Sequence, residues 1–159
     1  MRGLQSSRNT VMSFAAKNPA YTIVHSNLCR LQDVTSSHTY QKGSWTLHML
    51  RGVIGQDAFQ RGISAYYARH FNGNATTADF RQAMEEASGQ KLGWFFEKWL
   101  DKPGTLKVVG TWTYDAAARQ VRMNAKSNIF TINAPSEPEN VCLDPNLWVL
   151  MDATFEKRR

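Results

Sequence analysis

The chain has 159 residues and a formal net charge of +6, from 19 basic and 13 acidic residues, and 42% of its residues are hydrophobic. This composition is typical of a globular protein with one domain or two small ones, and it excludes wholesale disorder, collagen-like repeats and a disulfide scaffold. The longest apolar run, Leu147 to Met151, is far shorter than the ~20 residues of a membrane-spanning helix, and the polar first ten residues hold no signal-peptide core. We therefore predict no membrane segment in this chain, and its compartment stays unknown.

The basic residues and the cysteines carry little functional signal. The basic residues are spread singly along the chain, and their only run is Lys157-Arg158-Arg159. This spread is typical of a solvated surface, so we expect no nucleic-acid partner. Cys29 and Cys142 lie far apart and outside any CxxC pair, which favours two buried thiols over a disulfide but leaves their redox state open.

Helical periodicity dominates the chain up to Pro103-Gly104. A first helix is predicted over Gly3 to Lys17 and ends before Pro19, and a long irregular segment follows to Thr39. The second helix begins near Gln41 and ends at Gly55. Its apolar residues form two stripes over about half of the circumference, which indicates a central helix. These residues are Trp45, Leu47, Met49, Leu50, Val53 and Ile54.

Three shorter helices are predicted after Gly55. One covers Asp57 to His70, with Phe59, Ile63 and Tyr66 or Tyr67 on its apolar face. The next begins at Thr76-Thr77-Ala78-Asp79, where a Thr side chain and an acidic residue suit a helix start, and it ends at Gly89. The last covers Leu92 to Leu100 and is closed by Pro103-Gly104.

Strand patterns follow Gly104. Alternating apolar residues predict a strand over Leu106 to Tyr114, and Val121 and Met123 mark its partner. Up to three more short strands are predicted, at Ile129 to Asn133, Val141 to Leu143 and Leu147 to Met151. The predicted fold is therefore mainly α, with a helical lobe of about five helices over residues 1–103 and a short antiparallel, β-sandwich-like subdomain over residues 104–159.

No self-contained catalytic motif is present. The four histidines, His25, His38, His48 and His70, include no pair at the i, i+4 spacing of a helical metal site, and no Cys-His cluster exists. The chain also lacks a phosphate-binding glycine loop and a GxSxG nucleophile turn. We therefore expect no metal or other cofactor bound by this chain.

Five segments in order resemble one known family. Tyr40-Gln41-Lys42-Gly43 resembles the YxKG motif of the aminopeptidase N type of zinc metallopeptidases, family M1. Further similarity lies in Ile54-Gly55 with Phe59, Gly62 and Tyr66, in Asn74 to Phe80, in Glu86 to Gly89 with Phe95-Phe96 and Trp99-Leu100, and in Leu143-Asp144-Pro145 with Trp148. The resemblance extends from about Arg8 to Asp152.

The resemblance implies removal of N-terminal residues from peptides, with zinc bound by an HExxH motif and a further Glu. Neither HExxH nor the substrate-recognition motif GxMEN occurs in this sequence. The chain therefore resembles the part of the family that follows the zinc site, and by itself we expect it to be inactive. By position, Tyr40 matches the tyrosine that donates its O–H to the developing oxyanion. Lys42 is interpreted as a surface cation, and Gly43 as a site of close backbone packing.

Three functions follow as hypotheses. The first is the C-terminal part of an aminopeptidase-N-like enzyme, which acts on peptides only together with a zinc-bearing half. The second is a non-catalytic interaction module that binds a partner or a missing half of the enzyme. The third, less favoured, is a basic nucleic-acid-binding module that uses Trp112, Tyr114 and Trp148. Whichever holds, exposed apolar helix residues and unpaired sheet edges predict self-association of the chain as a homodimer, with ~800 Å² or more buried per subunit.

Overall fold

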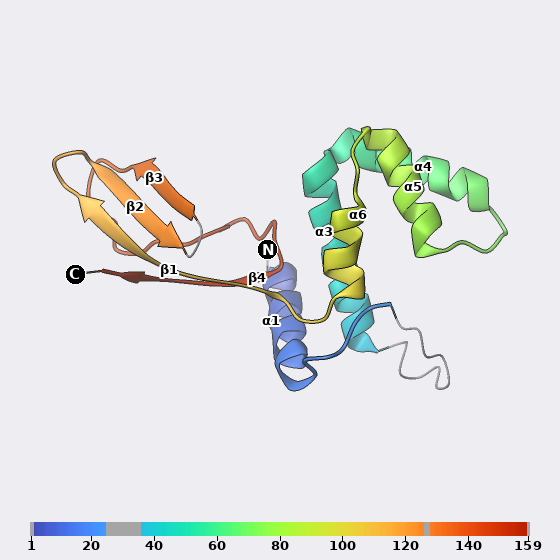
Figure 1. Cartoon of the computed structure of the whole chain (residues 1–159), viewed down its shortest axis with the longest axis horizontal. Helices are drawn as coiled ribbons and strands as arrows, with labels where there is room; N and C mark the ends of the chain where they lie inside the picture. The colour runs from blue at the N-terminus through green and yellow to red at the C-terminus, as the bar shows by residue number, and fades with distance from the viewer. Residues whose placement is uncertain (1, 25–35, 126–127, 159) are drawn as a thin grey trace. The chain divides into compact units, whose positions relative to one another are not determined.

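The computed structural model describes residues 2–24, 36–125 and 128–158 (Figure 1). Its contacts divide the chain into a helical unit, Met1–Gly104, and a sheet unit, Thr105–Arg159, with the division beside Pro103-Gly104. A mainly α fold with a small β part is therefore confirmed. None of the helices in the described part of the chain is both long and apolar enough to cross a membrane.

The central helix of the helical unit is α3, Ser37–Ile54. The Ser36 side chain accepts from the Thr39 amide at its start, and Gly55, with a φ of 84°, ends it. It begins four residues before the predicted start, so Tyr40 lies in its first turn. Helix α1, Arg2–Lys17, packs against it. The Trp45 indole N–H donates to the Ser7 hydroxyl over 3.2 Å, which ties the two helices together.

Helices α4, Gln56–His70, and α5, Thr77–Ser88, pack closely against each other. The predicted apolar face of α4 is wrong at Ile63, which is 38% exposed. Of the two alternatives Tyr66 and Tyr67, Tyr66 is partly buried against Phe80, and Tyr67 is 64% exposed. The buried residues of α4 are Ala58 and Gly62. A Cβ at Gly62 would lie 2.6 Å from the sulfur of Met84, so the lack of a side chain there lets α5 approach.

The last helical segment is a short α-helix that runs on as a π-helix. Helix α6, Gly93–Phe96, continues directly into the π-helix η1, Glu97–Asp101. The residues that this segment and its start bury are Leu92, Phe95, Phe96 and Trp99. The predicted helix over Leu92 to Leu100 is therefore confirmed in place, with a wider turn at its end.

The sheet unit is a single mixed sheet. Its strands are β1, Leu106–Asp115, β2, Gln120–Ala125, β3, Asn128–Asn133, and β4, Met151–Lys157, in the order β3-β2-β1-β4. Strand β2 pairs antiparallel with both β1 and β3, but β4 pairs parallel with β1. An antiparallel, sandwich-like arrangement is thus corrected to one open sheet with a parallel edge.

The prediction of strands at Val141 to Leu143 and Leu147 to Met151 is wrong, because the chain forms a loop from Val141 to Leu150 and Met151 is only the first residue of β4. Asp144, with a φ of 53°, accepts hydrogen bonds from the Trp148 and Val149 amides and shapes this loop. The last strand lies further on, where Met151, Ala153 and Phe155 alternate with exposed residues.

The core of the sheet unit is built on Trp112, Val121 and Met123, with Val141, Leu143 and Phe155 packed against it. Because Trp112 is buried there, it is not available to stack on a base. An aromatic platform that uses Trp112 for nucleic acid is therefore wrong.

Candidate functional site

Tyr40 lies in the first turn of α3, and 70% of its surface is exposed. A hydroxyl cluster supports the chain immediately before it. The Tyr21 hydroxyl lies 2.8 Å from the Ser36 hydroxyl and 2.9 Å from that of Thr39, and Phe14 packs edge-on against the Tyr21 ring. The backbone that carries Tyr40 is thus fixed by capping and side-chain bonds, while its phenol points away from the core.

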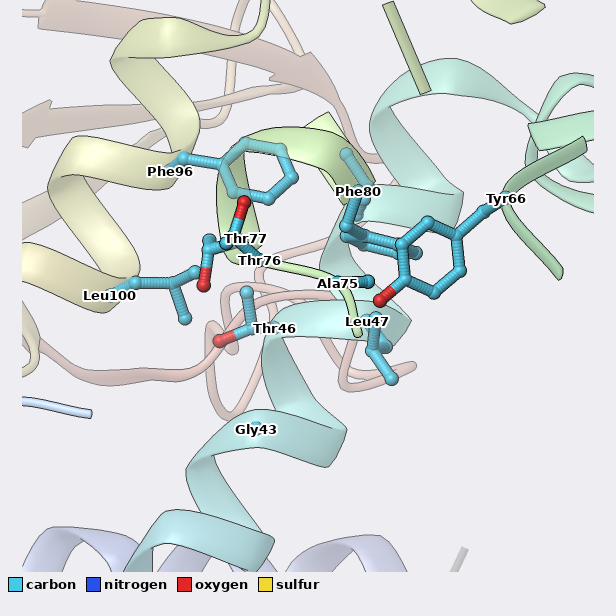
Figure 2. Close-up of a pocket in the computed structure, with 11 residues that line it drawn as sticks. Gly43, Thr46, Leu47, Tyr66, Ala75, Thr76, Thr77, Phe80, Phe96 and Leu100 are labelled. Atoms are coloured by element: carbon cyan, nitrogen blue, oxygen red, sulfur yellow. The ribbon is translucent and has the colours of Figure 1, made fainter. Parts of the chain in front are cut away.

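The helix face below Tyr40 opens into a pocket. Gly43 and Leu47 follow Tyr40 at i+3 and i+7, so all three share one face of α3. Gly43 and Leu47 line a cavity of about 360 Å³, whose other walls come from Tyr66 of α4, the start of α5, and α6 with η1. Figure 2 shows these side chains converging above α3, with Thr46 and Leu47 below and Phe96 and Phe80 above.

The pocket is mainly apolar, with a few hydroxyl groups. Leu50, Phe80, Phe96 and Leu100 provide hydrocarbon surface. Thr46 already donates its hydroxyl hydrogen to the Lys42 carbonyl over 2.9 Å, and Thr76 donates to the Asp79 carboxylate over 2.7 Å. Tyr66 and Thr77 add two further hydroxyl groups to the lining, and none of the lining residues that the structure describes is charged. The cavity therefore suits an apolar side chain, with hydroxyl groups available for a neutral polar atom, rather than a charged group.

Gly43 contributes bare backbone to this wall. A Cβ at Gly43 would meet nothing within 4 Å, so the interpretation of Gly43 as a close packing site is wrong for the described part of the chain. The lack of a side chain instead leaves open space one turn below Tyr40. Anything bound along this face can therefore approach the α3 backbone directly.

The side chain of Lys42 is buried, whereas the sequence predicted an exposed one. It is 1% exposed, so the interpretation as a surface cation is wrong. Burial, and then repulsion from Lys98, lower the pKa of its ammonium group. Within residues 2–24, 36–125 and 128–158 the ammonium group has no ion-pair or hydrogen-bond partner. The motif residue beside Gly43 thus brings a charge into the helical unit instead of onto its surface.

The described residues do not form a zinc site. Among them, no three His, Cys, Asp or Glu side chains gather as metal ligands would. The His48 ring lies against Trp45, and its Nδ1 is 3.3 Å from the Arg51 guanidinium. Cys142 is an exposed free thiol, so the prediction of burial is wrong for it. His25 and Cys29 lie outside the described residues, as does the side chain of His38. The metal of the resembled family therefore does not fit the donors present here.

Comparison with known proteins gives consistent matches over the helical unit. The model of the peptidase family M1 domain matches residues 6–99. Aminopeptidase N of Caulobacter vibrioides is 35% identical over 100 residues, which cover 62% of this chain and 11% of that protein. Aminopeptidase N of Lactococcus lactis subsp. lactis is 41% identical over 69 residues, which cover 43% of this chain and 8% of that protein.

A solved structure agrees in fold. The crystal structure of Legionella pneumophila aminopeptidase A in complex with aspartic acid aligns with a TM-score of 0.58 at 18% identity, over 72% of this chain and 13% of that one. The chain thus spans only about a tenth of the length of the relatives it matches. Because the family match covers residues 6–99, more than half of the sequence, this chain belongs to peptidase family M1, of the aminopeptidase N type.

Proposed function

We propose that residues 1–104 form the lobe that supplies the transition-state-binding tyrosine of an M1 aminopeptidase, and that the zinc and the general base come from another part of that enzyme. The single observation that carries this proposal is the placement of Tyr40. Its phenol is exposed at the rigid first turn of α3, above an open pocket on the same helix face.

The chemistry of the phenol suits this role. A neutral phenol donates one hydrogen bond, and a donor held in place before the reaction stabilises the charge that develops on the scissile carbonyl oxygen. The zinc of the family would have to be held by residues outside the described part of this chain, where it would supply Lewis-acid chemistry to the same carbonyl. Because the described residues hold no zinc site, Tyr40 supplies one part of the reaction and not the whole.

A chimaera tests whether this lobe functions in an active enzyme. The 100 matched residues of Caulobacter vibrioides aminopeptidase N are replaced by the aligned residues of this chain. We expect the chimaera to hydrolyse aminoacyl amides within about a hundredfold of the parent rate, which is the loss that a small misplacement of catalytic groups causes. A chimaera that folds and retains zinc but shows no hydrolysis would contradict the proposal.

A non-catalytic interaction role has one observation in its favour. Three apolar residues of the edge strand β3, Ile129, Phe130 and Ile132, are half exposed or more. This surface belongs to the sheet unit, and Tyr40 belongs to the helical unit. The two roles are therefore separable by variants of the two units.

A further inference from the structure

Strand β3 is an edge of the sheet, and its own six residues hold no feature that blocks further pairing. It is hydrogen-bonded to β2 alone among the described strands (Figure 1). Its sequence, Asn-Ile-Phe-Thr-Ile-Asn, holds no charge and no proline. The other edge strand, β4, carries Asp152, Glu156 and Lys157. Since charged residues and proline are what natural edge strands use to block further pairing, β3 is open to another strand and β4 is guarded.

The register of β3 puts apolar side chains on the core face of the sheet. Phe130 lies opposite Met123, and Ile132 lies opposite Val121. Both partners on β2 are buried in the sheet core, but Phe130 and Ile132 remain 50% and 54% exposed. The apolar face of the sheet thus continues to its edge, where nothing in the described chain covers it.

We propose that β3 pairs antiparallel with β3 of a second copy, about a two-fold axis at Thr131, to form one eight-stranded sheet. A two-fold axis perpendicular to a sheet keeps the core faces of both copies on the same side. With the axis at Thr131, Phe130 of each copy lies opposite Ile132 of the other, and the two Thr131 residues face each other. Aromatic with β-branched pairs and Thr with Thr pairs are both stabilising across strands.

The neighbouring register is less favourable. An axis at Phe130 would place Ile132 of each copy opposite position 128 on the core face, whereas the axis at Thr131 places Ile129 opposite Asn133 on the other face of the sheet. The axis at Thr131 thus joins Phe130 and Ile132 of the two copies on the core face, and Met123 and Val121, which lie opposite them on β2, continue this face within each copy. The core face of β3 is therefore self-complementary about Thr131, which favours a second copy as the partner.

Charge permits this contact despite the net charge of +6 on each copy. The strand itself is uncharged, and Arg122 lies opposite Thr131 on the neighbouring strand β2. In the joined sheet the two Arg122 residues are separated by three strand spacings, roughly 14 Å. That separation exceeds the screening length of about 8 Å at physiological salt, so their repulsion is small.

The interface is small. Pairing of two short strands covers less than the ~800 Å² per partner of a standard interface. We therefore expect a dimer that forms at high micromolar concentration, with the dissociation constant set by Phe130 and Ile132 and by the new main-chain bonds.

Sedimentation equilibrium of the full chain tests the pairing with a matched pair of variants. Thr131→Lys places two ammonium groups face to face at the axis, and Thr154→Lys adds the same charge to the other edge strand. We expect wild type and Thr154→Lys to approach twice the monomer mass with rising concentration. The dissociation constant of the Thr131→Lys dimer should be higher by about tenfold or more. Circular dichroism checks that both variants remain folded.

Cross-linking tests the register. In a Cys29→Ser, Cys142→Ser background, Thr131→Cys is expected to form a covalent dimer on mild oxidation, because residues opposite each other at the axis lie at disulfide distance. Thr154→Cys is the control that should stay monomeric. A wild-type chain that remains monomeric at high concentration, equal dimerisation of both lysine variants, or equal cross-linking of both cysteine variants would overturn the proposal.

Discussion

The ammonium group of Lys42 lies inside the helical unit, and a second cation, Lys98, repels it. A buried charge without a partner destabilises the fold. We expect Lys42→Met, which keeps the length of the side chain, to raise the free energy of unfolding by on the order of 1–3 kcal/mol. Urea unfolding measures this, and Lys91→Met, at an exposed site, should change it by less than about 0.5 kcal/mol.

The same residue predicts a pH dependence. The pKa of Lys42 is lowered in the folded chain from its ordinary value of 10.5, so between the two values the unfolded chain binds more protons. The free energy of unfolding should therefore rise with pH through this interval, as the cost of the buried charge disappears. The difference in the free energy of unfolding between wild type and Lys42→Met should therefore shrink as the pH approaches 10.5. A gap that stays constant would show that Lys42 is not a buried charge.

Two glycines in helices are expected to respond in opposite ways to alanine. At Gly43 an added Cβ meets nothing within 4 Å, so Gly43→Ala should raise the free energy of unfolding by about 0.5–1 kcal/mol through helix propensity. At Gly62 the Cβ would meet the buried Met84 side chain at 2.6 Å, so Gly62→Ala should lower it by about 1 kcal/mol. Thermal unfolding of both variants checks the difference, and equal effects would contradict the packing described here.

The start of α5 is held by a reciprocal pair of side-chain bonds. The Thr76 hydroxyl accepts from the Asp79 amide at 3.3 Å, while the Asp79 carboxylate accepts from the Thr76 amide at 2.8 Å. Thr76→Ala should cost about 1 kcal/mol of unfolding free energy, and Thr77→Ala, one residue inside the helix, should cost much less.

Acid should remove this contribution. Hydrogen bonds from Thr76 lower the pKa of Asp79, so the carboxylate stabilises the fold above the ordinary pKa and loses that effect as the pH falls through the lowered value. The difference in the free energy of unfolding between Thr76→Ala and wild type should thus be smaller in acid than at neutral pH. An unchanged difference in acid would exclude the carboxylate from the cap.

Most element positions followed from local signals in the sequence. The Thr76 to Asp79 start, the glycine ends at Gly55 and Gly89, and the alternation in β1 act over a few residues, so the structure has them where the pattern indicated. The position and parallel pairing of β4 depend on contacts with a strand 45 positions earlier. No local pattern specifies such a partner, because the alternation of apolar residues shows which face of a strand is buried but not which other strand it pairs with.

The candidate site was less accessible to sequence reasoning than the fold. The motif around Tyr40 is a local signal that singles out this residue, and Tyr40 lies exposed in the first turn of α3. The burial of Lys42 was missed, because a lone lysine between polar neighbours looks like a surface residue. The pocket was missed as well, since its walls come from separate helices and only folding brings Thr46, Thr76 and Phe96 together.

At the scale of the whole molecule, the chain is predicted to bind no zinc in stoichiometric amount and to hydrolyse no aminoacyl amide by itself. The reason is that its described residues bring no three metal-ligating side chains together. Elemental analysis and a chromogenic aminoacyl assay of the purified chain check both parts. One equivalent of tightly held zinc with chelator-sensitive hydrolysis would show that the chain is complete as an enzyme.

The most direct test of Tyr40 as the oxyanion-binding residue is the kcat of the aminopeptidase N chimaera with Tyr40→Phe. Loss of one preorganised donor should lower kcat by about 10²–10³-fold and leave KM nearly unchanged. Tyr67→Phe, which removes an exposed hydroxyl from α4 in the same lobe, should leave kcat unchanged. A Tyr40→Phe chimaera as active as its Tyr67→Phe counterpart would contradict the assignment.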